Sequence, residues 1–427
     1  MKLNLKIPEE FLHFLWKNKL YYNENLETSL GEKIKIINPG LKNNDAGPDF
    51  FNAKIKINNT TWAGNVEIHI NSSDWEKHNH NKNKDYDSVI LQVVLNNDKP
   101  IYRSNNEIIP TVEIKYNNKY FENYNALLEN QLWIACEKNL PFVEEFIFTH
   151  WLTNLTAERL ERKSTEIIKK LNSNNNHWEE TFYQQLARSF GSKTNAEPFE
   201  WLAKSLPVKI LAKHKDNIHQ IEALLYGQAG FLNEPMGHEY YLNIKKEYEY
   251  LQKRHGLKPL QKHIWKFLRL RPLNFPTVRI AQFAQLIYKS SRLFSKIIES
   301  KSIEELYNLF NVSTSLYWKN HYNFNKTSKT SEKKPGKAFI NGILINTVIP
   351  FYFVYGIKKD NQYYKNKALK FLEHLPPESN SIISKWKELG IKVENAYISQ
   401  ALLQLKNEYC NRKKCLNCQI GNKIIIQ

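Results

Sequence analysis

The sequence predicts an α+β protein: an N-terminal mixed sheet with flanking helices, then a large, mostly α-helical region and a C-terminal cysteine cluster. Between about residues 32 and 116 apolar residues alternate with a period of two, as in strands with one buried face. From about residue 143 onward they recur every three or four residues, which is the spacing of amphipathic helices. A chain of 427 residues is long enough for two or three domains, each with its own core.

A helix is predicted to open the chain, because the apolar residues of segment 8–20 lie at helical spacing. Strands separated by turns rich in Asn, Asp, Gly and Pro follow it. The predicted strands are residues 32–37, 51–57, 62–70, 88–95 and 108–116. The segment "SSDWEKHNH" after the third strand is predicted to be a short helical or irregular connection.

These patterns divide the chain into four parts. They are an α+β domain (1–125), a helical domain (126–324), a basic linker or loop (325–337) and a C-terminal helical region with the cysteine cluster (338–427). The third part is assigned as a linker because it is basic, rich in Ser and Thr and almost free of apolar residues.

One apolar segment, "FINGILINTVIPFYFVYGI", has nearly the length of a membrane span. It contains Asn341, Asn346 and Pro350, which are unfavourable in lipid, so we expect a buried core helix broken near Pro350. At the N-terminus Glu9 and Glu10 interrupt the apolar run that a signal peptide needs. We therefore expect a cytoplasmic protein that does not enter a membrane.

The net charge of +18, from 61 Lys and Arg against 43 Asp and Glu, predicts a polyanionic partner, with nucleic acid and DNA favoured. A basic surface that serves only solubility is the alternative. In "IWKFLRLRPLNFPTVRIAQF" basic residues are interleaved with aromatic residues, as in segments that contact phosphates and stack on bases. The candidate nucleic-acid-binding residues are Lys266, Arg269, Arg271 and Arg279, whereas the aromatic residues are expected in the helical core.

Acidic and basic side chains gather on the predicted sheet. In "AGNVEIHI" the residues Glu67 and His69 share one face of a strand, because side chains alternate. Asp49 in "GPDF" precedes the neighbouring strand and approaches them if the two strands form a hairpin. Two converging carboxylates repel each other unless a cation lies between them, which predicts a Mg²⁺ or Mn²⁺ site on an open face of the sheet.

This order of residues resembles the PD-(D/E)XK nuclease superfamily, whose core is a helix, three strands, a helix and a further strand. The resemblance implies that Asp49 and Glu67 bind the metal and that His69 replaces the lysine that orients the attacking water. The three residues are then the catalytic candidates, because a histidine can also accept a proton near neutral pH. An early acidic residue often joins such sites, and the candidates here are Glu9, Glu10 and Glu32.

Two further histidines suggest a different chemistry. His78 and His80, together with His69, could build a nitrogen-rich Zn²⁺ or Mn²⁺ site for hydrolysis of a small substrate. A solvated polar loop is the alternative. Oxygen-dominated Mg²⁺ chemistry is the preferred prediction.

The cysteines form a second candidate metal site. Cys410, Cys415 and Cys418 have the spacing C-x4-C-x2-C, and Cys136 follows the predicted sheet domain. Four thiols suffice for Zn²⁺ or a [4Fe–4S] cluster. The arrangement resembles superfamily nucleases that join distant segments through a four-cysteine iron–sulfur cluster. Independent reduced cysteines are the alternative.

Longer motifs are similar to a bacterial family called domain of unknown function 2851. They include "NDAGPDFFNAKI", "GNVEIHINSSDWEKHNH", "ALLYGQAGFL" and "YCNRKKCLNCQIG". The family brings no known activity. Three hypotheses remain: a metal-dependent nuclease or nuclease-derived processing protein, a non-catalytic nucleic-acid-binding protein with a degenerate site, and a zinc or manganese hydrolase of a small substrate.

Overall fold

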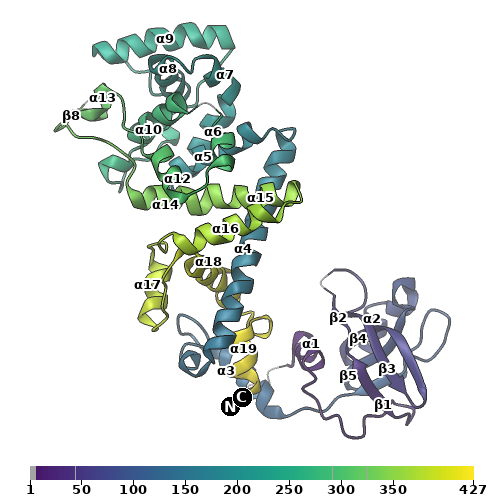
Figure 1. The fold of residues 1–427 in the computed structure, drawn as a ribbon. Helices are drawn as coiled ribbons and strands as arrows, with labels where there is room; N and C mark the ends of the chain where they lie inside the picture. Colours follow the sequence, from purple (N-terminus) through teal and green to yellow (C-terminus); the bar gives the residue numbers. More distant parts are fainter. Residues whose placement is uncertain (1–5, 44, 291, 325) are drawn as a thin grey trace. The chain divides into compact units, whose positions relative to one another are not determined.

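A computed structural model describes residues 6–43, 45–290, 292–324 and 326–427 of this mixed α+β protein. The chain forms two compact units (Figure 1). The first unit contains residues Met1–Trp151 together with Lys406–Gln427, and the second contains Leu152–Leu405. The predicted α+β region therefore lies in the first unit, and the predicted helical region lies mostly in the second.

A mixed sheet is the centre of the first unit, with strand order β1-β3-β4-β5-β6 and the short β2 beside β3. Pairing is antiparallel from β1 to β4 and parallel from β4 to β6. The strands are β1 (Ile34–Asn38), β2 (Leu41–Lys42), β3 (Phe50–Ile57), β4 (Thr60–Asn71), β5 (Val89–Asn96) and β6 (Thr111–Glu113). Each predicted strand is present, although the last keeps only three residues.

The helix α1 (Glu9–Lys17) opens the chain, as expected from its apolar spacing. It buries Phe11 and Leu15 completely. The ring of Phe11 contacts Tyr116 and also Tyr124 in α3 (Asn118–Glu129). With one face of α1 packed in this way, Glu9 and His13 on the helix lie near Asp49, which precedes β3.

Short helices connect β4 to the parallel strand β5, as predicted for segment 72–80: α2 (Asp74–Lys77), η1 (His80–Lys82) and η2 (Lys84–Tyr86). Trp75 anchors this crossover: it is completely buried and packs in one cluster with Val89, Ile101 and Ile109. Its indole N–H donates to the carbonyl of Tyr102 at 3.0 Å. The crossover is thereby fixed against the sheet.

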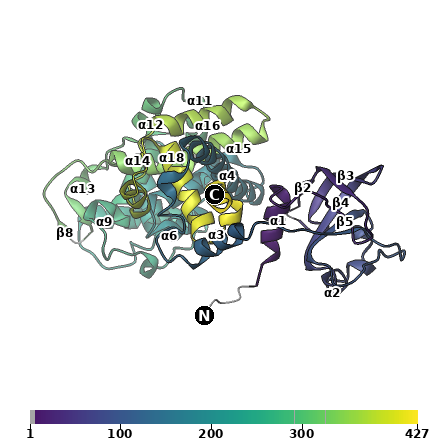
Figure 2. The ribbon, with the colours of Figure 1, turned by 90° about the horizontal axis from the view of Figure 1, so that it is seen from below.

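The C-terminus returns to the first unit, where α19 (Gln419–Ile426) lies beside α3 (Figures 1 and 2). Asn123 donates to the carbonyl of Ile425 at 3.1 Å, and Lys119 donates to the carbonyl of Gln427 at 2.6 Å. The first unit thus extends beyond the predicted end at residue 125 and takes the last residues from the predicted 338–427 region. Contacts between segments so far apart along the chain cannot be recognised from the local sequence pattern of either segment.

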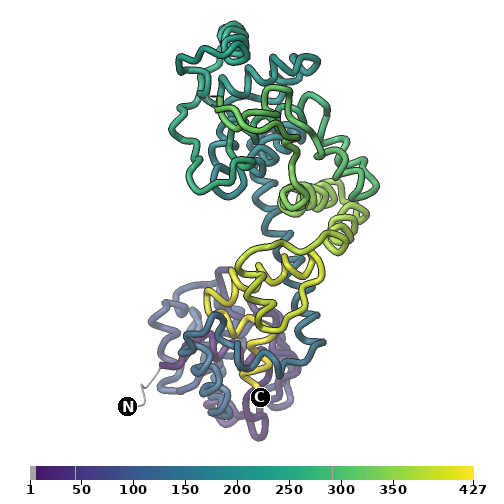
Figure 3. Tube along the Cα trace, turned by 90° about the vertical axis from the view of Figure 1, so that its left-hand side faces the viewer, coloured from purple at the N-terminus to yellow at the C-terminus, as the bar shows by residue number. Residues whose placement is uncertain are grey.

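Helices build the second unit around one large hydrophobic core, and Figure 3 follows the chain through them. The long helix α4 (Glu145–Ser173) begins in the first unit and continues in the second. The others are α5 (Trp178–Phe190), α6 (Ala196–Ser205), α7 (Val208–Lys213), α8 (Ile218–Gln228), α9 (Glu239–His255), α10 (Pro276–Lys289), α11 (Leu293–Glu299), α12 (Ile303–Phe310), α13 (Leu316–Lys319), α14 (Lys337–Ile343), α15 (Ile349–Lys358), α16 (Gln362–His374), α17 (Ser381–Glu388) and α18 (Ala396–Gln404).

The apolar segment around Pro350 is helical throughout. Between α14 and α15 the π-helix η6 (Leu344–Val348) replaces the predicted break. A proline lacks an N–H and clashes with the carbonyl four residues earlier, and a π-turn widens the helix where this happens. In the described part of the chain only Lys337–Lys358 is long and apolar enough to cross a membrane. Because 61% of its apolar window is buried, it fits the core helix of a soluble protein.

The predicted linker is a loop of the second unit in its described residues, 326–337; residue 325 lies outside them. It begins with β8 (Lys326–Thr327), which pairs with β7 (His321–Asn323). Lys333 is buried, donates to the carbonyl of Lys319 at 2.6 Å and lies over the ring of Tyr322. Of the two predicted descriptions, linker or loop, loop fits the described residues of this segment better.

Candidate metal centre

The hairpin of β3 and β4 brings Asp49 and Glu67 to the same end of the sheet. The amide of Asp49 donates to Oε2 of Glu67 at 3.0 Å, and the amide of Ile68 donates to Oδ2 of Asp49 at 2.9 Å. A bulge interrupts the pairing here, with Asn52 in the left-handed region at a φ of 55°. Such bulges re-aim side chains next to functional sites.

The face that carries Glu67 and His69 is not open, contrary to the expectation. Glu67 is 5% exposed and His69 is fully buried, because the crossover between β4 and β5 covers this end of β4. The ring of His69 contacts Trp75 of α2 at 6.4 Å between centroids. Alternation along a strand identifies which residues share a face, but it does not reveal what covers that face.

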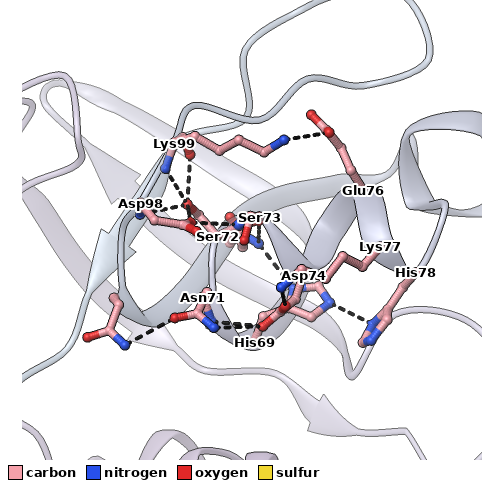
Figure 4. A network of polar contacts seen from close by, with 12 residues as sticks. His69, Asn71, Ser72, Ser73, Asp74, Glu76, Lys77, His78, Asp98 and Lys99 are labelled. Carbon is pink, nitrogen blue, oxygen red and sulfur yellow. Dashed lines mark hydrogen bonds and ion pairs between the residues drawn. The ribbon is translucent and has the colours of Figure 1, made fainter.

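Three histidines meet under this cover. One nitrogen of each of His69, His78 and His80 lies within 4.8 Å of the others. His69 Nε2 is 3.2 Å from His78 Nδ1 (Figure 4). Oε1 of Glu67 lies 3.2 Å from His80 Nε2 and 3.7 Å from His69 Nε2. Three imidazoles from β4, the end of α2 and η1 therefore surround one small volume, with the Glu67 carboxylate beside two of them.

Hydrogen bonds fix the turn that aims the crossover (Figure 4). The hydroxyl of Ser72 donates to Asp98 at 2.7 Å, and the amide of Ser73 donates to the same carboxylate at 2.8 Å. Asp74 accepts from the amide of Asn71 at 3.0 Å. These contacts set the direction in which α2 leaves β4, and so they position His78.

Gln92 of β5 holds the far side of the His69 ring. Its Nε2 lies 3.1 Å from His69 Nδ1 and donates to the carbonyl of Ser72 at 3.2 Å, while Thr111 donates to its Oε1 at 3.3 Å. In this orientation the amide donates to Nδ1, so the proton of the neutral ring is on Nε2 and faces His78. A cation bound by Nε2 would require the ring proton on Nδ1, and the Gln92 amide would then have to turn so that its Oε1 accepts from Nδ1.

Burial dominates the electrostatics of the cluster. It raises the pKa of Glu67 to about 8, and the charge of Asp49 adds to this shift. Burial, with contributions from His80 and His78, lowers the pKa of His69 to about 3. Burial also lowers the pKa of His80. At neutral pH the His69 ring is therefore uncharged, as a metal ligand must be, and Glu67 carries a proton that a bound cation would release.

A second group of ligands adjoins the first. Glu9, His13 and Asp49 also have ligand atoms within 4.8 Å of one another. His13 Nε2 is 3.3 Å from Oδ2 of Asp49 and 3.8 Å from Oε1 of Glu9. Burial and the neighbouring Asp49 raise the pKa of Glu9. Asp49 belongs to this group through its carboxylate and touches the histidine group through its amide.

Of the early acidic candidates, only Glu9 reaches the site among the described residues. Glu32 accepts from the hydroxyl of Thr28 at 3.2 Å, and Glu10 is exposed. Sequence reasoning missed His13, although it follows Glu9 by one helical turn and so shares its face. It also missed Gln92, because a glutamine in a strand carries no distinctive pattern.

The predicted nucleic-acid-binding residues lie in the second unit, where three are exposed, including Arg271, and one is buried. Lys266 and Arg269 are exposed. Arg279 is buried at 4% exposure, donates to Gln282 and Asn274, and lies over the ring of Phe339. Burial lowers its pKa to about 9. As expected, Trp265 and Phe283 lie in the core and Phe267 packs against it, while Phe275 contacts Phe267.

The four cysteines gather in the first unit. Cys136 follows α3, Cys410 ends the π-helix η7 (Leu405–Cys410), Cys415 begins η8 (Cys415–Asn417) and Cys418 precedes α19. Burial raises the pKa of Cys136 to about 12, and the neighbouring Cys418 and Cys415 add to this shift. Cys410 is similarly affected by the other three.

The sulfur of Cys418 is buried, and burial raises its pKa. The amides of Gly421 and Ile420 point at the sulfur and lower its pKa against the effect of burial. A side chain at Gly421 would clash with the carbonyl of Cys415 at 2.3 Å, so only glycine allows this approach. No three of the sulfurs are within 4.8 Å of one another among the ligand groups of the described residues.

Comparison with known proteins gives a family but no activity. No curated protein and no solved structure matches the chain. The family model described as protein of unknown function DUF2851 matches residues 9–381, which include the sheet, the histidine cluster and most of the second unit. The chain belongs to the DUF2851 family.

Proposed function

We propose that the first unit hydrolyses phosphodiester bonds with a divalent transition metal held by Glu67, His69, His78 and His80, and that Asp49 lies next to the metal. The observation that carries the proposal is the convergence of three histidine nitrogens, with Oε1 of Glu67 3.2 Å from His80 and 3.7 Å from His69. A bound cation would activate a water molecule and stabilise negative charge in the transition state.

The ligand set favours Mn²⁺ or Zn²⁺ over the Mg²⁺ that the sequence favoured. Magnesium prefers oxygen ligands and keeps much of its water shell, whereas imidazole is a good ligand for zinc and other first-row metals. His69 and His78 share one hydrogen bond at 3.2 Å. A cation would replace this contact and gain two nitrogen ligands.

A phosphodiester substrate is supported by the element order and the charge. The series α1, β1, β3, β4, α2 and β5 follows the order of the PD-(D/E)XK core, with β4 and β5 parallel. On this comparison Asp49 and Glu67 would correspond to its acidic pair. Two features depart from that pattern: His69 replaces the lysine, and α2 has only four residues. The net charge of +18 favours a polyanionic substrate.

The test combines cleavage with metal binding. Purified protein is incubated with single- and double-stranded DNA and RNA in Mg²⁺, Mn²⁺ or Zn²⁺. We expect cleavage with Mn²⁺ or Zn²⁺ and a loss of at least about 100-fold in Glu67→Gln and His80→Gln, because losing a ligand removes several kcal/mol of transition-state stabilisation. His263→Gln, at an exposed histidine of the second unit, is the matched control.

Equal cleavage by wild type and both site variants would assign the activity to a contaminant. The nitrogen-rich cluster also favours a second candidate, a hydrolase of a small substrate. In that case metal binding would persist with the same dependence on His80, no nucleic acid would be cleaved, and small esters or phosphomonoesters would be hydrolysed instead. A binding protein with a degenerate site would bind nucleic acid but no metal.

We further propose that the four cysteines hold a [4Fe–4S] cluster that joins the C-terminus to α3. A zinc ion with Zn–S bonds of about 2.3 Å would bring its four sulfurs to within about 3.8 Å of one another. Among the described residues no three of these sulfurs lie within 4.8 Å of one another, which favours the larger cluster over a zinc ion. The amides directed at Cys418 and the nearby Lys406 and Lys413 would offset the negative charge of the cluster.

A further inference from the structure

The second unit contains a cavity of about 800 Å³ that plays no part in the proposed metal centre. Ligand pockets of small molecules have volumes in this range. Its walls come from α4, α5, the turn after α5, η5 (Pro272–Asn274), α10, α14 and η6. All of these lining residues belong to one compact unit, so the cavity does not depend on how the two units are arranged.

Positive charge dominates the lining. Five cationic side chains line the cavity against one acidic side chain, Glu166, and the five are Lys163, Arg188, Lys193, Arg271 and Arg279. Glu166 is already within 3.9 Å of Arg162. Arg188 pairs with Glu200 at 2.7 Å, and Glu200 also binds Lys170 and Lys204. The other four cations form no ion pair among the described residues, so the cavity has an excess of positive charge.

Two of these cations are held in place by neutral partners. The ammonium of Lys163 donates to Asn346 at 2.8 Å and to Gln400 at 3.3 Å. Burial lowers the pKa of Lys163 to about 7, with Arg159 and Arg162 adding to this shift and Glu378 and Glu166 opposing it. Arg279 is 4% exposed, and its Nε finds no hydrogen-bond partner among the described residues. A buried guanidinium with an unused donor is costly unless an acceptor arrives.

The lining also supplies neutral polar groups beside the cations, namely Gln185, Ser189, Ser192, Asn274 and Asn346. One carboxylate could not neutralise several cations, whereas a di- or triphosphate carries several charges and many acceptor oxygens. Arginine binds such oxygens in pairs because its guanidinium is planar and has five donors. The volume leaves room for more than inorganic phosphate.

We propose that this cavity binds a nucleoside di- or triphosphate, with the phosphates held by Lys193, Arg271 and Arg279. Arg271 and Lys193 are exposed at the cavity and supply mobile donors, whereas the buried Arg279 forms part of its floor. This proposal does not depend on the metal centre of the first unit.

Calorimetric titration of the full chain with ADP, sodium pyrophosphate and adenosine tests the proposal, in EDTA and at constant ionic strength. We expect saturable one-to-one binding of ADP, weaker binding of pyrophosphate and none of adenosine. Arg271→Gln and Lys193→Gln should each weaken ADP binding about tenfold or more, because each removes a charge-assisted contact. Their melting temperatures should stay unchanged, since both side chains are exposed.

Lys266→Gln is the matched control, because it removes the same charge from an exposed lysine that does not line the cavity. Equal weakening in this control would mean that ADP binds through general surface charge and would overturn the proposal. Absence of ADP binding would also overturn it. So would binding confined to a 5′-phosphorylated DNA oligonucleotide, which would make the cavity part of a nucleic-acid surface.

Discussion

At the scale of the residue, Asp49 and Glu67 meet at one end of the sheet, where His69 and His80 lie beside the Glu67 carboxylate. Their meeting could be predicted because the alternating apolar pattern and the short turn set the register of the hairpin. His13 and Gln92 could not, because their roles arise from packing between elements. The Mg²⁺ prediction rested on the two carboxylates alone, whereas the folded chain adds three imidazoles to Glu67.

One buried carboxyl should make stability depend on pH. Glu222 is 1% exposed and accepts from Ser315 at 2.7 Å and Tyr240 at 2.8 Å. Burial raises its pKa from 4.5 to about 7, so the folded protein favours the protonated form. Its contribution to the free energy of unfolding is fully present below pH 4.5 and is lost as the pH rises toward 7. The loss should be on the order of 3 kcal/mol.

Denaturant unfolding of wild type and Glu222→Gln at several pH values between 4 and 8 measures this effect. The variant should lose the part of the pH dependence that comes from Glu222, since an amide does not titrate. Parallel stability curves for the two proteins would show that Glu222 does not titrate in this range.

At the scale of the element, regular periodicity predicted the strands and α1, and the turn residues between them predicted where each strand ends. The crossover was the least regular part, yet it carries His78 and His80 and closes the site. Pro350 was expected to break a helix, and instead a π-turn accommodates it. Local sequence indicates where a regular hydrogen-bond pattern fails, but packing decides whether the chain bends, breaks or widens.

The crossover depends on Trp75, so this residue links stability to the metal centre. Trp75→Ala should lower the free energy of unfolding of the first unit by about 3–5 kcal/mol, as for other large-to-small changes in a core. It should also weaken metal binding, because His78 and His80 lose their support. Trp201→Ala, at a half-exposed tryptophan of the second unit, is the control and should change neither quantity. Unchanged metal affinity in Trp75→Ala would show that the packing of Trp75 is not needed to position His78 and His80.

At the scale of the whole molecule, the division into units follows contacts between distant segments. The predicted boundaries at residues 125 and 338 came from changes in periodicity, whereas the first unit recovers the last residues through α3 and α19. The clustered cysteines were the one sequence signal of this return, since a shared metal would require Cys136 and Cys418 to meet.

The cysteine centre gives a prediction at this scale. Protein purified without oxygen should be brown and contain about four iron and four sulfide per chain, as a [4Fe–4S] cluster requires. Cys418→Ser should lose the colour and the iron and destabilise the first unit, because metal binding contributes directly to folding. Ser189→Ala, in the second unit, should keep both. A colourless protein with one zinc per chain would contradict the iron–sulfur assignment.

The central claim is that Glu67 and three histidines bind a transition metal. Equilibrium dialysis of the otherwise unchanged protein against Mn²⁺ and Zn²⁺, followed by elemental analysis, tests it most directly, because the cysteine centre then contributes equally to wild type and site variants. We expect His69→Gln, His80→Gln and Glu67→Gln each to bind one ion fewer per chain than wild type, with His263→Gln unchanged. Metal content that is the same in all of these variants would contradict the account.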